Sequence, residues 1–294
     1  ESFEGRIVKL TANLTFEDDE VFTPIGTKQT PFKGTFDGQN YTISNINFGE
    51  TNTQKGVGLF GYVENATIKN VTVANSRVKG FSYVGMIAGY AVNTKFENVH
   101  ANECILETAN ISTYNIYTEI MEGNKVVYPI DDAERGSSLN YEELEGKSDF
   151  ENEIEKRECF SSLIGYAKGC KLFMTSVRSS DASNFLIKLE NTLFFDEDDD
   201  VKSGFYFGYL IGKAEDGTTI DQSYVDAQKA YDGIPLHNGA TLSNCYYRYR
   251  SPGTTKEVFY KNTSTQYAKT DLKNHPNIWL EINGRWVLQI FYWN

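Results

Sequence analysis

The sequence predicts an all-β protein, a right-handed parallel β-helix (β-solenoid) with two lateral excursions and a C-terminal cap. The first observation is a repeat: GLFGYVENATIKNVTV at 58–73 is followed by GMIAGYAVNTKFENVHA at 85–101, and matching glycine, apolar and asparagine positions lie 28 residues apart. A fixed period of this size is typical of units that bury their apolar side only by stacking on one another. The second is composition: 19 Tyr and 19 Phe favour strands, and only 6 Pro and 3 Met argue against a disordered or helix-rich chain.

Length and charge narrow the function classes. The 294 residues are enough for one solenoid with a continuous core. The net charge of −12 disfavours nucleic acid and anionic lipid as partners, since both would repel the chain. No apolar run reaches the ~18 residues that span a bilayer, so we expect no membrane insertion. The chain begins at Glu1, which suggests a processed form or a fragment of a longer protein.

The N-terminal part reads as strands. GRIVKLTANLTF alternates from Gly5 onward, and Asp37-Gly38 is a tight-turn pair within FKGTFDGQNYTISNINF. We align its TISNINF with the TIKNVTV of the next unit, which places Ile43 on Ile68. The same cassette recurs, and the first positions of its six copies are Ile43, Ile68, Phe96, Leu172, Ile220 and Leu242.

A polar column occupies the third position of the cassette. Its members are Asn45, Asn70, Asn98, Met174, Gln222 and Asn244. Asparagine tolerates the left-handed conformation that a bend requires, and stacked amides can hydrogen-bond along a column at ~4.8 Å per coil. We therefore predict an inward asparagine ladder at a bend, with a solvated polar stripe as the alternative.

We predict one solenoid domain over residues 1–294. Its coils span about 5–102, 159–180 and 204–250, its excursions about 103–158 and 181–203, and its cap about 251–294. The first excursion is acidic, with eleven acidic and four basic residues in 131–158. In the cap, the Asn283-Gly284 turn predicts that the last strand folds back on IWLEI of its own chain. The alternative is that this strand covers the edge of a neighbouring chain.

The GLFG at 58–61, the following ATIKNVTV and the upstream FKGTFDG at 32–38 resemble the GLUG-motif family of surface proteins. The match is good over about 5–101, partial at 161–169 and 208–217, and returns in DLKNHPNIWLEINGRWVL. The resemblance implies a right-handed parallel β-helix on an adhesin-like or secreted protein, without a defined active site. The two excursions depart from the pattern, so we expect the particular function to lie there.

Metal sites have weak support in the sequence. The acidic run DEDDD supplies carboxylates for Ca²⁺ at Asp196, Asp198, Asp199 and Asp200. It lacks the glycine-bearing spacing of a calcium loop, so we expect a solvated acidic loop, with calcium binding as the alternative. The three histidines and four cysteines show no zinc spacing, and we expect no other cofactor.

Four cysteines allow three pairings. Cys104 and Cys159 stand at the two ends of the larger excursion, where a disulfide would close its neck and stabilise the fold by ~4 kcal/mol in the chain-entropy model. We predict this disulfide alone, with four free, buried thiols as the alternative.

Catalytic residues are sparse. There is no Gly-x-Ser-x-Gly elbow and no phosphate-binding loop. The second cassette position carries Glu97 and Asp221, two coils apart at roughly 9–10 Å, near the upper limit for an inverting glycosidase pair. Phe173 lies between them, so we expect a solvated face there.

Aromatic residues gather at the fifth cassette position, which reads Ser176, Tyr224 and Tyr246 in the last three copies. A short outward column of this kind can stack on sugar rings. We expect ordinary cross-strand stacking instead.

Asn-x-Ser/Thr sequons mark glycosylation candidates at Asn13, Asn40, Asn65, Asn110 and Asn262. Asn70 is a sixth sequon, which we expect to carry no glycan because the ladder turns it inward.

These observations favour a non-enzymatic extracellular or cell-surface module for structure or adhesion, which binds a protein or glycan surface through its excursions. One alternative is a filament or coat subunit that assembles with copies of itself end to end. Another is a glycan-degrading β-helix enzyme centred on Glu97 and Asp221.

Overall fold

The computed structural model describes residues 1–17, 20–49, 55–80, 82–108, 159–179, 194–195, 201–202, 206–227, 239–250, 257–261, 265–267, 279–282 and 285–288. Every regular element within these residues is a β-strand, so the all-β prediction is confirmed. The predicted excursions and cap fall largely outside the described residues.

Most strands belong to four sheets, which we name A to D. Sheet A contains β1 (Ile7–Lys9), β2 (Leu14–Thr15), β4 (Thr35–Ser44), β8 (Thr67–Ala74), β12 (Lys95–Asn102), β16 (Lys171–Phe173), β17 (Ser176–Ser179), β22 (Thr219–Asp221), β23 (Tyr224–Ala227), β24 (Thr241–Ser243), β25 (Tyr246–Arg250), β26 (Glu257–Lys261) and β27 (Thr265–Tyr267). Sheet B contains β3 (Val21–Phe22), β5 (Asn47–Phe48), β9 (Arg77–Gly80) and β13 (Ile105–Thr108). Sheet C contains β7 (Phe60–Glu64), β11 (Ala88–Val92), β15 (Ile164–Lys168) and β21 (Ile211–Glu215). Sheet D contains β6 (Lys55–Val57), β10 (Ser82–Gly85), β14 (Cys159–Ser161) and β20 (Tyr206–Gly208).

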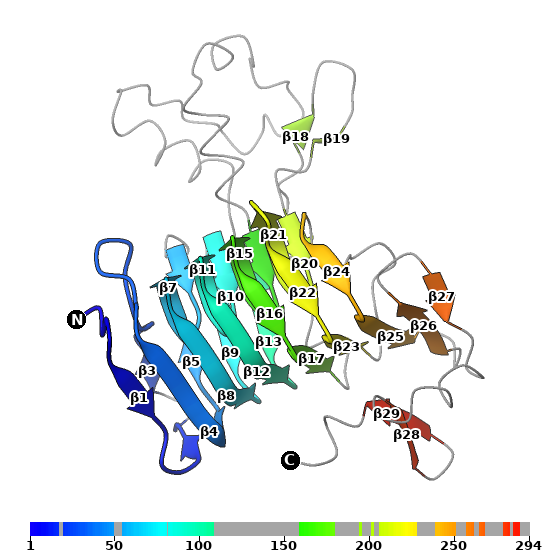
Figure 1. Cartoon of the computed structure of the whole chain (residues 1–294), viewed down its shortest axis with the longest axis horizontal. Helices are drawn as coiled ribbons and strands as arrows, with labels where there is room; N and C mark the ends of the chain where they lie inside the picture. The colour runs from blue at the N-terminus through cyan, green and yellow to red at the C-terminus, as the bar shows by residue number, and fades with distance from the viewer. Residues whose placement is uncertain are drawn as a thin grey trace, which may run out of the picture.

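From β6 to β13 the chain visits sheets D, C, A and B in turn, and the later described passes visit D, C and A, each beside the previous one (Figure 1). We call β6–β9 coil I, β10–β13 coil II, β14–β17 coil III and β20–β23 coil IV. Strands of successive coils pair in parallel, and Ile68 of coil I pairs with Phe96 of coil II, as the 28-residue period predicts. Coil II continues through β13, which lies inside the first predicted excursion.

The glycines of the repeat are required where sheets C and D approach each other. A Cβ atom on Gly89 would lie 2.3 Å from the Tyr83 carbonyl oxygen and 2.6 Å from the Val57 nitrogen. A Cβ atom on Gly165 of coil III would likewise lie 2.6–2.8 Å from backbone atoms of coil II. Because the neighbouring atoms belong to the backbone, any side chain at these positions would force the coils apart.

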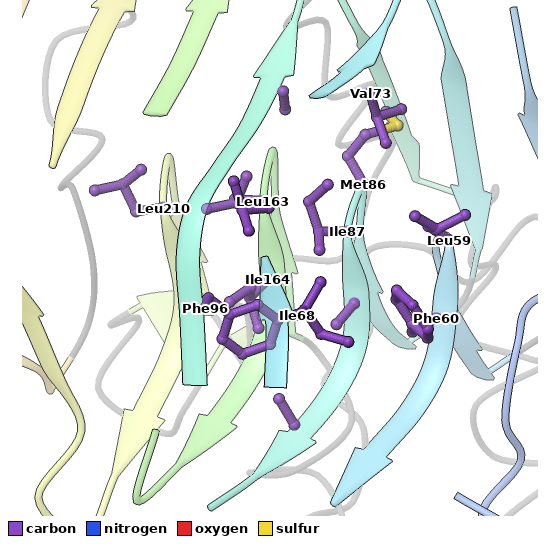
Figure 2. Close-up of a cluster of buried hydrophobic side chains, with 14 of the residues drawn as sticks. Leu59, Phe60, Ile68, Val73, Met86, Ile87, Phe96, Leu163, Ile164 and Leu210 are labelled. Carbon is purple, nitrogen blue, oxygen red and sulfur yellow. The ribbon is translucent and has the colours of Figure 1, made fainter. Parts of the chain in front are cut away.

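Apolar side chains from successive coils fill the interior (Figure 2). The labelled residues come from sheets A and C and from the turns between sheets D and C, and each is at most 1% exposed: Leu59, Phe60, Ile68, Val73, Met86, Ile87, Phe96, Leu163, Ile164 and Leu210. Each coil therefore buries its apolar side against its neighbours.

The predicted bend of the cassette is confirmed. All six residues of the third-position column adopt positive φ between 48° and 61°: Asn45, Asn70, Asn98, Met174, Gln222 and Asn244. Most are asparagine, which tolerates this conformation better than other non-glycine residues.

The predicted register of the first copy is wrong. Ile43 pairs with Val73 rather than with Ile68, and Phe36 takes the position opposite Ile68. The left-handed residues Gln39 and Asn40 form an irregularity after Asp37 and add residues to β4 relative to β8. Asn45 therefore belongs to the following bend, where its N–H donates to Ala74 O.

The predicted inward direction of the column is also wrong. Asn70 and Asn98 are half-buried, and Gln222 and Asn244 are exposed. Inward positions on both sides of the bend are already filled, by Ile68 and Val71 in coil I. The reason for expecting no glycan at Asn70 is therefore lost.

The C-terminal end of sheet A is extended by antiparallel strands, since β26 pairs with β25 and β27 pairs with β26. The last described strands, β28 (Trp279–Ile282) and β29 (Arg285–Leu288), form an antiparallel pair around Asn283-Gly284. This confirms that the final strand folds back on its own chain. A further antiparallel pair, β18 (Phe194–Phe195) and β19 (Val201–Lys202), flanks the acidic run in sequence.

Candidate functional site

A chain of hydrogen bonds crosses β4, β8, β12 and β17 on the outer side of the bend in sheet A. The Ser176 hydroxyl oxygen lies 2.6 Å from His100 Nδ1, and His100 Nε2 lies 2.9 Å from Asn98 Oδ1. Asn98 Nδ2 donates to Asn70 Oδ1 over 3.1 Å, and Asn70 Nδ2 donates to Asp37 Oδ1 over 3.1 Å. We call these five residues the polar relay.

Donation along the relay runs in one direction. Asn98 Oδ1 can only accept, so Nε2 of His100 carries the proton and Nδ1 accepts from the Ser176 hydroxyl. The last acceptor is the carboxylate of Asp37, whose other oxygen lies 3.5 Å from Lys69 Nζ. The relay therefore needs a neutral imidazole in its middle.

The two titratable members of the relay, His100 and Asp37, have pKa values shifted for different reasons. His100 is only 4% exposed, and burial lowers its pKa to about 4. Burial alone would raise the pKa of Asp37, but hydrogen bonds from Asn70 and Gln39, together with the charge of Lys69, hold it below its ordinary value. The histidine is thus neutral and the aspartate ionised at neutral pH.

Serine, histidine and an amide oxygen in a row have the composition of a nucleophile, a base and an orienting group. Ser176 is 0% exposed, so its hydroxyl has no surface that a substrate can contact. The relay instead links four neighbouring strands of sheet A.

A second set of contacts lies on the outer face of sheet C. Tyr62, Tyr90 and Tyr166 occupy the same register position in coils I to III, and we call them the tyrosine column. Ring centroids are 5.5 Å apart between Tyr62 and Tyr90, and 4.7 Å apart between Tyr90 and Tyr166, whose planes differ by 12°. Tyr83 packs its ring against Tyr90 at 5.1 Å, edge to face, and has φ of 54°, which is strained for an aromatic residue.

The tyrosine column also ends at a carboxylate. The Tyr166 hydroxyl donates to Glu215 Oε2 over 2.6 Å, and Lys213 Nζ lies 3.3 Å from Glu215 Oε1. Burial raises the pKa of Tyr62, Tyr90 and Tyr166, and the hydrogen bond to Glu215 raises that of Tyr166 further. Since the rings face one another along the column, their faces are filled and offer little area on which a sugar ring could stack.

The candidate catalytic pair lies where the cassette register predicts. Glu97 pairs with Phe173, and Phe173 pairs with Asp221, so the phenylalanine separates the two carboxylates by one strand. Phe173 is 40% exposed, and Asp221 accepts a hydrogen bond from Asn244. The structure thus interposes an apolar ring between the two acids.

The fifth-position column stacks as expected, with Tyr224 and Tyr246 ring centroids 5.9 Å apart and their planes 19° apart. Both tyrosines are at least 93% buried. The same column contains His100 and Ser176, which pair in register. Sequence reasoning missed His100, although its place two residues after Asn98 puts both side chains on the outer face of β12.

No disulfide joins any of the four cysteines and all four are buried, so the predicted Cys104–Cys159 disulfide is absent. Cys104 precedes β13 of sheet B, whereas Cys159 begins β14 of sheet D, so the two thiols lie on different sheets. Cys104 Sγ lies 3.4 Å from the Asn102 carbonyl oxygen, a contact that Ser76 makes through its hydroxyl to Ala74 O. The Cys104 thiol therefore makes the contact that the Ser76 hydroxyl makes in the preceding coil.

The same corner contact recurs at six residues that each follow a left-handed position and carry a donor. It runs from the side chain to the carbonyl oxygen two residues earlier at Ser76, Thr94, Cys104, Cys170, Ser223 and Cys245. Burial raises the pKa of Cys104 to about 12 and those of Cys170 and Cys245 to about 11. These thiols are therefore protonated and unreactive at neutral pH.

The remaining predicted sites are only partly described. Asn13, Asn40 and Asn65 are exposed. Asn110, Asn262 and the calcium candidates Asp196, Asp198, Asp199 and Asp200 lie outside the described residues. Within the described ranges, no three His, Cys, Asp or Glu side chains are close enough to hold a metal ion.

Comparison with known proteins gives one short likeness. No family model matches the chain, and no solved structure matches it significantly. Part of the chain is similar to halomucin from Haloquadratum walsbyi, with 31% identity over 97 residues. This stretch is 31% of the chain and 1% of halomucin, so the chain spans a very small part of that protein. Among the described residues, no helix has the length and apolarity needed to cross a membrane.

Proposed function

We propose that the chain is a non-enzymatic structural and adhesion module of an extracellular or cell-surface protein. In this proposal the coils form a right-handed β-helix, the hand that parallel crossovers adopt almost without exception. The GLUG-like repeat is consistent with it. So is the likeness to a protein named as a mucin, since mucins are a class of extracellular proteins.

The observation that carries the proposal is the use of the outer faces in the described coils. The polar relay and the tyrosine column direct polar and aromatic side chains at the next coil rather than outward. Residues 109–158, inserted between coils II and III, carry 13 acidic and 5 basic side chains. We assign binding of a protein or glycan surface to this segment and to residues 181–203, and scaffolding to the coils.

A replacement of residues 109–158 tests this division. A short Gly-Ser linker from Thr108 to Cys159 should leave the strand circular dichroism and cooperative unfolding intact, because both ends lie on adjacent coils. The same variant should no longer bind intact cells of the source organism, measured by flow cytometry with the labelled protein.

A matched control keeps the segment length and replaces its acidic residues by Asn and Gln. If the linker variant still binds cells as well as the parent chain, the binding site lies elsewhere. If the linker variant loses cooperative unfolding, the segment is part of the core and the division is wrong.

The alternative of end-to-end assembly has one supporting observation. Ile7 on β1 and Leu14 on β2 are 64% and 41% exposed, at the N-terminal end of sheet A. At the opposite end of sheet A the described strands β26 and β27 are antiparallel, so the two ends of this sheet differ in strand direction. Sedimentation velocity separates monomer, dimer and polymer.

A further inference from the structure

The polar relay crosses the seam between coils II and III. Residues 109–158 separate β13 from β14 in sequence, so direct contacts hold these two coils together. In sheet A these contacts are the pairing of β12 with β16 and β17, which places Phe96 on Leu172 and His100 beside Ser176. His100 and Ser176 form a buried polar contact of this seam, over 2.6 Å, and Arg178 of coil III lies 3.8 Å from Glu103 of coil II.

The imidazole lies among uncharged side chains. β8 presents Thr72 and β17 presents Ser176 in register with His100, and its own strand contributes Asn98 through a hydrogen bond. Asn102 follows on the same face of β12, with its Oδ1 buried and without a hydrogen-bond partner. Asp37, the acid of the relay, is reached only through two amides, and Lys69 lies beyond it.

The charged groups next in register are few. Glu97 precedes Asn98 on the other side of the bend, and Arg178 pairs with Asn102. Glu103 Oε1 lies 3.8 Å from Arg178 Nε, so this carboxylate is balanced by the arginine. Burial is the cause that lowers the pKa of His100, and no charged neighbour offsets it. A protonated imidazole at this position would therefore have no carboxylate to balance it.

We propose that His100 is an acid-sensitive latch, whose protonation at Nδ1 opens the seam between coils II and III. The protonated Nδ1 donates instead of accepting, so the buried Ser176 hydroxyl loses its acceptor. The imidazolium charge is then buried without a counter-charge, which favours the open state in which water solvates it.

The sign of the pH dependence follows from the two pKa values. The pKa of His100 is about 4 in the folded chain, against an ordinary value of 6.5. The open or unfolded chain therefore binds the proton more tightly, and stability is complete above pH 6.5. It falls as pH decreases from 6.5 to 4, and the equilibrium constant for opening rises on the order of 10²-fold across this window.

Urea denaturation of three proteins at pH 7.0 and pH 4.5 tests the latch. These are the parent chain, His100→Gln, and His237→Gln as a histidine control. Carboxylates titrate alike in all three, so the difference between parent and His100→Gln isolates the histidine. Between pH 7.0 and pH 4.5, we expect the folding equilibrium constants of the parent and of His237→Gln to fall by a factor on the order of 10² relative to that of His100→Gln. A parallel loss in all three proteins overturns the proposal.

NMR titration of the His100 ring in the parent chain is independent of whether His100→Gln folds. We expect an apparent pKa near 4, and a higher value in Ser176→Ala, which removes the hydroxyl that donates to the neutral form. A value near 6.5 in the parent chain contradicts the latch.

The buried thiols locate the opening. At pH 4.5, 4,4′-dithiodipyridine should label Cys104 of coil II and Cys170 of coil III faster than Cys245, which lies beyond coil IV. Peptide mapping by mass spectrometry measures each rate. Equal rates at these three cysteines would mean that acid unfolds the whole chain, and the seam would not be the element that opens.

Discussion

The outer faces of sheets A and C each carry a series of side-chain contacts that link successive coils, but the two series use different interactions. On sheet A, the polar relay joins successive strands by directed hydrogen bonds between amide, imidazole and hydroxyl groups. On sheet C, the tyrosine column joins coils I to III by contacts between rings. Each series ends at a carboxylate beside a lysine, Asp37 with Lys69 and Glu215 with Lys213.

The two series differ in how well they tolerate substitutions. A relay member must supply a donor to one coil and an acceptor to the next, so a missing group leaves a buried partner unpaired. A ring in the tyrosine column contributes area and dispersion, which another apolar side chain can partly replace. The relay therefore specifies the register of the coils more strictly than the tyrosine column does.

The largest expected effect comes from the backbone beneath the tyrosine column. Gly165→Val should destabilise the fold by at least about 3 kcal/mol, because its Cβ would meet backbone atoms of Val84 and Gly89 at 2.6–2.7 Å. Urea denaturation measures the loss. A change below about 1 kcal/mol would show that coils II and III separate easily, and that the tyrosine rings rather than the close backbone approach hold sheet C together.

The central members of the two series give the direct comparison. Asn98→Leu should cost about 3 kcal/mol, since it leaves His100 Nε2 and Asn70 Oδ1 without partners and places leucine in a left-handed bend. Tyr90→Leu should cost about 1 kcal/mol, because leucine retains much of the contact area. Asn98→Gly keeps the bend and loses only the hydrogen bonds, so it separates the two causes. Equal losses for Asn98→Leu and Tyr90→Leu would contradict the difference in tolerance.

The repeat and its bends could be predicted from the sequence, whereas the first register and the relay could not. Asn tolerates positive φ wherever it occurs, so Asn70 and Asn98 mark a bend by their chemistry alone. Asn45 also has positive φ but belongs to the next bend, because the irregularity at Gln39 and Asn40 adds residues to β4 relative to β8.

The cysteines and His100 show a different limit of prediction from the sequence. Cys104 follows a left-handed residue as Ser76 does, and this shared position signals a corner donor rather than a disulfide. His100 pairs with Ser176, and the two-residue alternation after Asn98 places both polar groups outward. Only the burial of that outer face, which depends on the folded chain, makes the pair a buried contact.

The two faces should lose stability at opposite ends of the pH range, the polar relay in acid and the tyrosine column in alkali. Because the pKa values of Tyr62, Tyr90 and Tyr166 are raised, their contribution to stability is complete below pH 10 and is lost as pH rises through the folded values. Tyr166→Phe should cost about 1.5 kcal/mol at pH 7 through the lost bond to Glu215 and should reduce the loss above pH 10. Denaturation at pH 7, 10 and 11, followed alongside tyrosinate absorbance, measures both effects. An alkaline limb unchanged in Tyr166→Phe would mean that other groups produce it.

Replacing the lysines at the two ends should have the smallest effect on stability, and it tests how strongly each lysine charge supports its series. Lys213 has a side chain only 12% exposed, and its Nζ lies 3.3 Å from Glu215 Oε1, while Glu215 also accepts a hydrogen bond from the Tyr166 hydroxyl. Lys69 is 35% exposed and lies 3.5 Å from Asp37, where water screens the pair. Lys213→Met should therefore cost about 1 kcal/mol and Lys69→Met less than about 0.5 kcal/mol in urea denaturation at pH 7. Asp37 keeps its hydrogen bonds from Asn70 and Gln39 when Lys69 is replaced, so the carboxylate stays ionised and the relay keeps its direction. If Lys69→Met instead costs as much as Lys213→Met, the lysine charge orients the relay, and hydrogen bonding to Asp37 is not enough to fix its end.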